Sequence, residues 1–143
     1  MLLTKYGKFN IFWLGMKKPP KIAQKPQTRE IVWVGGSKDD ISSFPDEVKR
    51  SFGARLYELQ SGAAVKDVKD MKPLPEFGTG VYELRENFDT NTYRVVHVLA
   101  LSKALYVLHA FMKKSKSGIA LPKPDKNTIE ARLQRAKEIE KEN

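Results

Sequence analysis

The sequence predicts one α+β domain, and three observations favour it. Strand-like and helical patterns follow one another in the order strand, helices, three strands, helix. The chain has 143 residues, 41% of them hydrophobic, which is enough to bury a hydrophobic core. The three central strand-like runs are joined by short connections. We therefore expect an antiparallel meander with the helices on one face of the sheet.

The first part of the domain combines one strand with two helices. The run EIVWVGG, which begins at Glu30, is β-branched and aromatic and ends in two glycines, so it predicts a strand and a turn. A short helical turn is expected near residues 39–43. A longer helix is expected near residues 45–61, because apolar residues recur there at helical spacing: Val48, Phe52, Leu56 and Leu59.

Three strands and a last helix complete the domain. The strands are expected over residues 81–87, 92–100 and 104–113, after a loop rich in proline and glycine. Thr128 and Asp125 are both candidates for the N-cap of the last helix. The apolar positions of that helix lie on one stripe: Ile129, Leu133, Ala136 and Ile139.

Most of the net charge of +9 belongs to an N-terminal extension. Residues 1–29 contain seven Lys or Arg and no acidic residue, so the remaining 114 residues have a net charge of only +2. The paired prolines of KKPPKIAQKPQ block a helix, and we expect a loosely ordered tether before a domain over residues 30–143. Bulk basicity is therefore a weak argument for nucleic acid binding, and clustered cations carry more weight.

Composition excludes several classes of function. The chain has no cysteine, which rules out disulfides and thiolate metal sites and favours a reducing cytoplasm. Two histidines do not make a convincing zinc site, so we expect neither a metal nor another cofactor. No apolar run approaches the roughly 18 residues that span a bilayer, and no membrane partner is expected.

Strand alternation predicts a cluster of ionisable side chains on one face of the sheet. In the last strand we expect Leu108 and its alternate neighbours Tyr106, Ala110 and Met112 to face the core. His109 and Lys113 would then lie on the open face. The polar positions of the three strands that converge on this surface are Glu83, Arg85, Arg94, His109, Lys113 and Lys114.

Such a cluster suits phosphodiester chemistry. Arginine gives permanent bidentate contacts to phosphate, and lysine adds a point charge. Cleavage also needs a group that moves the proton of an attacking 2′-hydroxyl, for which Glu83 and His109 are candidates. We favour His109, because histidine titrates near neutral pH. The reaction would be a metal-independent cleavage through a 2′,3′-cyclic phosphate.

Structural interpretations compete with this one. Glu83 and Arg85 can be an ion pair on a solvated face, and Arg94 a surface arginine. His109 lies inside an apolar strand and can be a hydrogen-bonded structural residue. His97 lies between two valines, and we interpret it as structural.

The order of these motifs resembles the phage-derived, HigB-like branch of the RelE/ParE toxin superfamily. The resemblance rests on SKDDISSFPDEVKRSFGARLYELQSG, KPLPEFGTGVYELREN, TYRVVHVLALSKALYVLHAFMKKSKSG and IEARLQRAKEIEKE, and covers roughly residues 30–142. It implies a RelE-like fold: an N-terminal strand and two helices, a three-strand antiparallel meander and a C-terminal helix. It also implies a basic concave surface on the sheet.

The resemblance further implies a toxin of a type II toxin–antitoxin module. Such a toxin is an endoribonuclease that cleaves messenger RNA, commonly on the ribosome, and is blocked by a helix-turn-helix antitoxin. Positions matched by motif to catalysis or phosphate contact are Lys72, Arg85, Arg94, Lys113 and Lys114, and Lys116 follows in the same run. His109 matches a characteristic position of the branch. Tyr82 and Phe111 would stack on bases if they are exposed.

The chain departs from the family pattern in two places. His97 stands near a position where this branch often has tyrosine, and the basic extension has no counterpart. ParE-type members of the superfamily poison DNA gyrase with the same fold. The alternatives are therefore a gyrase-inhibiting toxin, or an inactive homologue that only binds its antitoxin.

Overall fold

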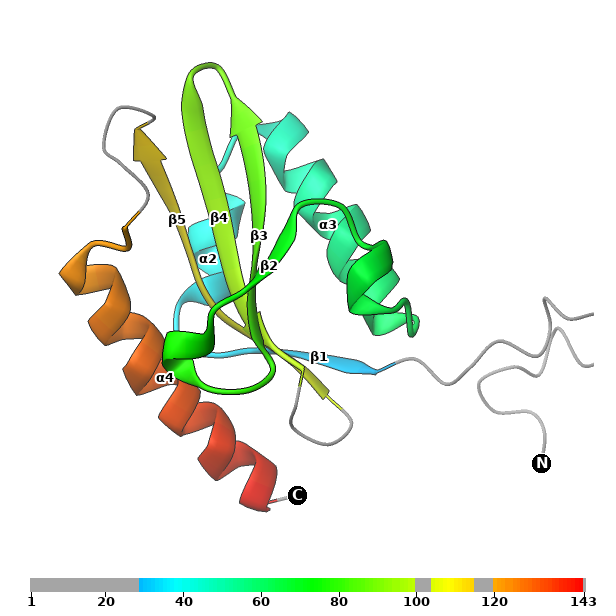
Figure 1. Cartoon of the computed structure of the whole chain (residues 1–143), viewed down its shortest axis with the longest axis vertical. Helices are drawn as coiled ribbons and strands as arrows, with labels where there is room; N and C mark the ends of the chain where they lie inside the picture. The colour runs from blue at the N-terminus through cyan, green and yellow to red at the C-terminus, as the bar shows by residue number, and fades with distance from the viewer. Residues whose placement is uncertain (1–28, 100–103, 115–119, 143) are drawn as a thin grey trace, which may run out of the picture.

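A five-stranded mixed sheet forms the centre of the protein (Figure 1). It is seen in a computed structural model that describes residues 29–99, 104–114 and 120–142. The strands, in the sheet order β1-β5-β4-β3-β2, are β1 (Glu30–Trp33), β5 (Ala104–Lys114), β4 (Asn91–Val98), β3 (Val81–Phe88) and β2 (Met71–Pro73). The helices are α2 (Ser37–Ser42), α3 (Asp46–Gln60) and α4 (Lys123–Glu142), with short 3-10 helices η2 (Val65–Asp67) and η3 (Pro75–Phe77).

The α+β fold and its antiparallel meander are confirmed. β3 pairs with β4, and β4 with β5, each antiparallel, while β1 adds to β5 in parallel. β2 lies in the stretch that we expected to be a loop, and three of its residues pair with β3. Residues 1–28 of the expected extension and the connection 100–103 lie outside the described residues.

The start of α4 differs from the sequence prediction. The helix begins at Lys123, so Asp125 and Thr128 both lie inside it and neither is its N-cap. The Thr128 hydroxyl donates to the carbonyl of Pro124 at 3.1 Å, which is a contact within the helix. Pro124 explains the early start, because proline is tolerated in the first helical turn.

Helices cover both faces of the sheet, and our prediction that they share one face was wrong. We call the two sides of the sheet the α3 face and the α4 face. On the α3 face, Phe52 and Leu56 of α3 pack in one core with Leu84 and Val95 of the sheet. On the other side, the α4 face, the apolar stripe of α4 packs against Val96, Tyr106 and Leu108. An apolar stripe predicts that a helix packs against the sheet, but it does not predict which face of the sheet the helix packs against.

A β-bulge in β5 changes the direction of its side chains. Val96 of β4 pairs with His109, whereas the next residue, His97, pairs with Val107. Leu108 is therefore an extra residue in β5. Leu108 and His109 consequently both lie on the α4 face, where Leu108 joins the core beneath α4 and His109 contacts that helix.

The bulge overturns the strict alternation that we predicted for this strand. Tyr106 and Leu108 lie in the core under α4, and Ala110 lies in the core under α3, together with Leu105 and Val107. Side chains therefore alternate between the two faces of the sheet within each half of β5. The alternation is shifted by one residue at Leu108.

Arg132 of α4 binds the backbone of β5 at the bulge. Its Nη1 donates to the carbonyl of Leu108 at 3.0 Å and lies 3.4 Å from the Asp40 carboxylate of α2. Gly35, in the turn before α2, has φ +61°, and a Cβ there would lie 2.6 Å from Nε of Arg132. Glycine thus provides both the left-handed turn and the space for the arginine. Within the described part of the chain, no helix is long and apolar enough to cross a membrane.

Candidate functional site

The α4 face of the central strands brings together five of the predicted site residues. Arg85 of β3 lies opposite Arg94 of β4, which lies opposite Phe111 of β5. One step along the strands, Glu83 lies in register with Val96 and His109. We call Glu83, Arg85, Arg94, His109 and Phe111 the sheet cluster.

Glu83 is the fully buried member of the sheet cluster. Its Oε2 accepts a hydrogen bond from Nε of Arg85 at 2.6 Å, and its Oε1 lies 3.5 Å from Nη1 of Arg94. Oε1 accepts no hydrogen bond. The Glu83–Arg85 contact is therefore not a pair on a solvated face, because the carboxylate is removed from water and faces two guanidinium groups.

Arg94 is buried as well, with only 4% of its surface exposed. Burial lowers the pKa of Arg94 from its ordinary value, although the nearby Glu83 carboxylate opposes that shift. The guanidinium carbon lies 5.9 Å from the ring centroid of Phe111, a cation–π distance. Nε of Arg94 has no hydrogen-bond partner. A buried guanidinium with unused donors is costly unless an anion supplies acceptors.

We expected His109 on an open face of the sheet. Its side chain instead contacts the first turn of α4. Its side chain is 12% exposed, and Nε2 lies 2.7 Å from Oδ1 of Asp125. Nδ1 lies 3.8 Å from the Asp40 carboxylate and has no hydrogen-bond partner. The ring stacks on Phe111, with centroids 5.1 Å apart. His109 thus links α2, α4 and the aromatic part of the sheet cluster.

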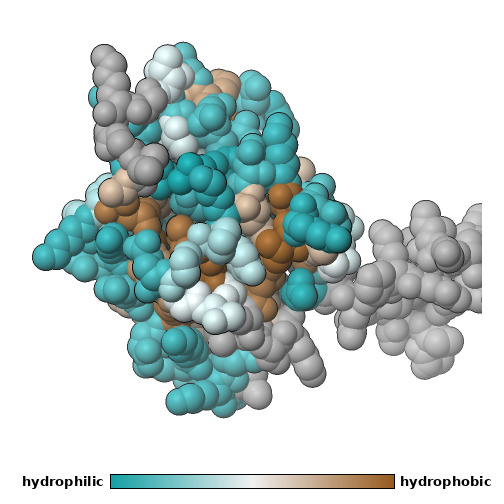
Figure 2. Space-filling model, viewed as in Figure 1, coloured by the Kyte–Doolittle hydropathy of each residue, from teal (hydrophilic) through white to brown (hydrophobic). Residues whose placement is uncertain are grey.

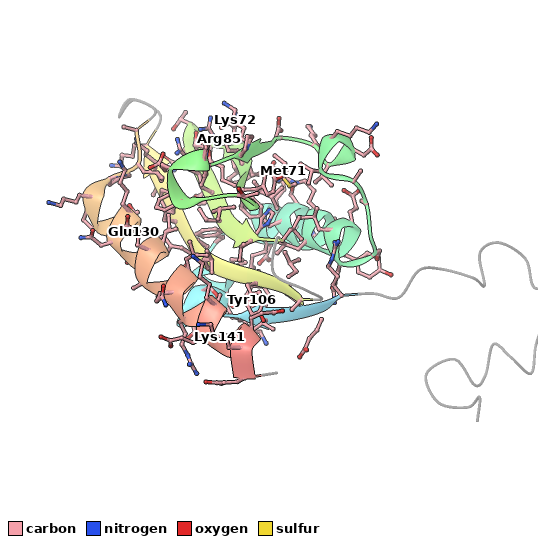
Figure 3. The ribbon with its side chains drawn as sticks, turned by 60° about the horizontal axis from the view of Figure 1, so that its bottom comes forward. Met71, Lys72, Arg85, Tyr106, Glu130 and Lys141 are labelled. Atoms are coloured by element: carbon pink, nitrogen blue, oxygen red, sulfur yellow. The ribbon has the colours of Figure 1, made fainter. Side chains whose placement is uncertain are left out.

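The predicted lysines do not share one position. Lys113 is 8% exposed, and its ammonium donates to the carbonyl of Ala120. Lys114 is exposed and, by alternation, lies on the α3 face, away from the sheet cluster. Lys72 of β2 is exposed and pairs in register with Glu83, and Figure 3 shows it at the same end of the molecule as Arg85. Lys116 lies outside the described residues.

Tyr82 lies on the α3 face and therefore does not join the sheet cluster. Its ring stacks on His97 with centroids 6.0 Å apart. His97 is fully buried, and neither of its ring nitrogens has a hydrogen-bond partner. Burial lowers the pKa of His97 to about 3, so the ring is neutral at physiological pH. These properties fit a packing role for His97.

Sequence reasoning missed three partners of the site. Asp125 and Arg132 come from α4 and contact β5 residues 16 and 24 positions away along the chain. Arg55 of α3 lies behind the sheet, where it donates to the carbonyl of Arg85 at 2.8 Å and pairs with Glu86 at 2.7 Å. No local pattern marks these residues, because their contacts depend on how α3 and α4 dock on the sheet.

The chemistry of the surface follows from its charges. Within the sheet cluster two guanidinium groups meet the single carboxylate of Glu83, while the Asp125 carboxylate contacts His109. The guanidinium groups supply donors that can bind an anion. Among residues 29–99, 104–114 and 120–142, no group of three His, Asp or Glu side chains is placed to hold a metal ion. In the view of Figure 2, most of the upper part of the molecule has a hydrophilic surface, and patches of hydrophobic surface are visible below it, in the middle of the molecule.

Comparisons with known proteins give two findings. A family model described as "Phage derived protein Gp49-like (DUF891)" matches residues 39–134. Among solved structures, the crystal structure of the toxin–antitoxin complex RelBE2 from Mycobacterium tuberculosis is similar, with a TM-score of 0.44 and 13% identity. That alignment covers 64% of this chain and 97% of the other. A comparison with curated proteins gives no match.

Proposed function

The chain belongs to the phage-derived Gp49-like family, and on that premise we propose that it is the toxin of a type II toxin–antitoxin module. The proposal also rests on the order of its motifs, which resembles the HigB-like branch of the RelE/ParE superfamily. The partner would be a helix-turn-helix antitoxin, and the site of action the cytoplasm. The functional domain would span residues 30–143.

The proposed activity is a metal-independent endoribonuclease that cleaves messenger RNA on translating ribosomes. The observation that carries it is the cross-strand pair of Arg85 and Arg94, which share the single carboxylate of Glu83. Like charges directly opposite each other destabilise a sheet. A phosphate bound between the two guanidinium groups would remove that penalty, and the planar fork of arginine matches its oxygens.

The reaction would proceed by attack of the neighbouring 2′-hydroxyl on phosphorus. The hydroxyl loses its proton, the new P–O bond forms, and the bond to the 5′-oxygen breaks as that oxygen takes up a proton. Arg85 and Arg94 would stabilise the negative charge that develops on the phosphate, assisted by Lys113. Glu83 and His109 are the groups of the sheet cluster that can move protons, and each has one atom without a hydrogen-bond partner: Oε1 of Glu83 and Nδ1 of His109.

Further RNA contacts are proposed on both sides of the sheet cluster. Lys72 is exposed beside Glu83, which suits a contact to a neighbouring phosphate. Phe111 is partly exposed beside Arg94, and it is the residue of the sheet cluster proposed to stack on a base. Lys114, Lys116 and Tyr82 belong to the same proposed set, but Lys114 and Tyr82 would need RNA that reaches the α3 face.

The test replaces each arginine of the cross-strand pair. We expect Arg85→Ala and Arg94→Ala to relieve growth arrest on induction and to lower RNA cleavage at least a hundredfold, because each removes a phosphate contact made in the transition state. Cuts would be mapped as RNA 5′ ends in induced cells, and folding checked by circular dichroism. Arg135→Ala, an arginine on the exposed side of α4, is the matched control. Full toxicity in both variants of the pair would contradict the assignment.

A toxin without nuclease activity is the second candidate. It is favoured by the fact that His109 and Lys113 are engaged inside the fold, with Asp125 and the Ala120 carbonyl. Such a protein would inhibit DNA gyrase or only bind its antitoxin. Accumulation of gyrase–DNA cleavage complexes and an SOS response, with intact RNA, would support the gyrase alternative over the ribonuclease.

A further inference from the structure

We propose that Arg55 is a positioning residue, which sets the spacing of the Arg85 and Arg94 guanidinium groups from the opposite face of the sheet. The inference rests on the proposed ribonuclease function and adds to it a residue of α3 that acts only through Arg85. Arg55 belongs to the α3 face, where its Nη1 donates to the backbone carbonyl of Arg85 at 2.8 Å. The side chain of Arg85 lies on the other face, with the sheet cluster.

Arg85 and Arg94 form the closer of the two kinds of antiparallel cross-strand pair. The backbone N–H of Arg85 donates to the carbonyl of Asp70 at 3.2 Å, and the backbone carbonyl of Arg85 accepts from Arg55. Both backbone groups therefore point away from β4, so the two arginines are not a hydrogen-bonded pair. The Cα atoms of such a pair are about 4.5 Å apart, against about 5.5 Å in a hydrogen-bonded pair. A small shift of the Arg85 backbone thus changes the spacing of two cations that are to meet one phosphate.

The outer edge of β3 loses its neighbouring strand at this point. β2 pairs with β3 only as far as Leu84, which lies opposite Met71. Among the described strands, none lies beside β3 on that edge from Arg85 onward. A strand carbonyl on an unpaired edge has no donor from a sheet ladder. Arg55, from the helix beside β3, supplies the donor that a strand would otherwise give (Figure 1).

Arg55 is itself fixed by contacts to three parts of the fold. Its Nη1 also donates to the carbonyl of Lys69, in the loop before β2, at 3.1 Å. Its Nη2 donates to the Glu86 carboxylate at 2.7 Å and to the Ser51 hydroxyl of α3 at 3.0 Å. Only 6% of Arg55 is exposed. Because Glu86 balances its charge and the rigid fork fixes its direction, Arg55 is suited to hold a backbone rather than to bind RNA.

The spacing of the arginine pair matters most in the transition state. Negative charge develops on the phosphate as the 2′-oxygen attacks, so donors must be aimed at positions that the bound substrate does not yet occupy. A displacement of about 1 Å at a reacting centre can cost about a hundredfold in rate. Loss of the Arg55 contact should therefore lower kcat and leave KM nearly unchanged.

The test is a double-mutant cycle on the cleavage of an mRNA with one mapped site, bound to purified ribosomes. Arg55→Lys keeps a cation beside Glu86 but loses the fork, so we expect kcat to fall about tenfold and KM to change less than about twofold. In the Arg85→Ala background the same substitution should change kcat less than about twofold, because the group that Arg55 positions is gone. A merely structural role would lower activity by the same factor in both backgrounds.

Two further variants complete the cycle. Arg50→Lys is the matched control, because Arg50 is an exposed arginine of the same helix, and its kcat should stay within about twofold of wild type. Ser51→Ala removes one acceptor of the Arg55 fork and is the milder variant if circular dichroism shows that Arg55→Lys does not fold. We expect it to lower kcat about threefold, again only where Arg85 is present.

A second readout is independent of cleavage. The Nε–H of Arg85 donates to the buried Glu83 carboxylate at 2.6 Å, and its NMR signal is identified by its absence in Arg85→Ala. Arg55→Lys, or Ser51→Ala in its place, should shift or broaden this signal, because the backbone that carries Arg85 is released. Arg50→Lys should leave the signal unchanged.

The outcomes separate this inference from the proposed function. If the wild type cleaves, an unchanged kcat in the Arg55 and Ser51 variants, or an equal loss in both backgrounds, would overturn the role of Arg55 and leave the ribonuclease proposal standing. If the wild type does not cleave, the proposed function fails and the Arg85 signal decides. A displaced signal would then support the positioning of Arg85 by Arg55, and an unchanged signal would refute it as well.

Discussion

Glu83 and His97 are two buried polar side chains with opposite surroundings. Glu83 faces the guanidinium groups of Arg85 and Arg94, so its charge is compensated. His97 has no hydrogen-bond partner and stays neutral, because burial lowers its pKa to about 3. Both residues occupy ordinary strand positions in the sequence. Only the register of the neighbouring strands determines which of them meets a charge.

The low pKa of His97 predicts a loss of stability in mild acid. An unfolded chain binds a proton at His97 near the ordinary value of 6.5, whereas the folded chain does so only near pH 3. The free energy of unfolding should therefore fall as the pH drops through this window, by about 2 kcal/mol between pH 7.5 and pH 5. Urea denaturation at the two pH values measures this change.

The comparison that isolates His97 is the His97→Leu variant. This variant buries no unpaired nitrogen, so it should keep wild-type stability at pH 7.5 and lose about 2 kcal/mol less than wild type at pH 5. An identical pH dependence of the two proteins would show that His97 is not the group responsible.

Among the elements, the β3–β4 hairpin is closed by the most strained turn that the structure describes. Thr90 is a β-branched residue with φ +67°, a conformation that costs of order 1 kcal/mol. Thr90→Gly should therefore raise the free energy of unfolding by about 1 kcal/mol, which thermal and urea denaturation would detect. Asp89→Gly should give less, because aspartate tolerates positive φ better than threonine. A destabilised Thr90→Gly variant would contradict this account of the turn.

The elements differ in how well the sequence predicts them. The long strands and helices follow from residue type and periodicity, and their order is correct. β2 was missed, because three residues in a proline-rich stretch carry no period. The bulge at Leu108 was missed for a different reason: an extra residue in a run of apolar side chains leaves the composition unchanged. The bulge leaves His109 on the same face of the sheet as Arg85 and Arg94, because all three lie on the same side of it in the register of the strands.

At the level of the whole molecule, Arg132 joins parts that lie far apart in the sequence. It connects α4 to the carbonyl of Leu108 and to Asp40 of α2. Arg132→Met should lower the free energy of unfolding by about 2 kcal/mol, because a charged hydrogen bond is lost and the buried Leu108 carbonyl is left without its donor. Arg135→Met is the control: its ion pairs lie on the exposed side of α4 and contribute little. Equal stability of the two variants in urea denaturation would refute this role of Arg132.

The same long-range contacts limit what the sequence reveals of the candidate site. Alternation within single strands was enough to bring Glu83, Arg85 and Arg94 together. It does not show that α4 covers His109, or that Asp125 binds it, because the side of the sheet on which α4 docks depends on the connection after β5. The side chain of Arg85 is partly exposed, at 27%, whereas that of His109 is largely covered, at 12%.

The bulge at Leu108 has a consequence for comparing relatives of this chain. Deleting that one residue would restore a regular strand and leave both halves of β5 in their present register with β4. Deleting a residue between His109 and Lys113 would instead move every later side chain of β5 to the opposite face of the sheet. Lys113 would then leave the α4 face. Insertions and deletions in this strand should therefore be aligned at position 108. A relative with a gap at position 108 would lack the carbonyl that binds Arg132. In such relatives we expect the residue aligned with Arg132 to vary freely.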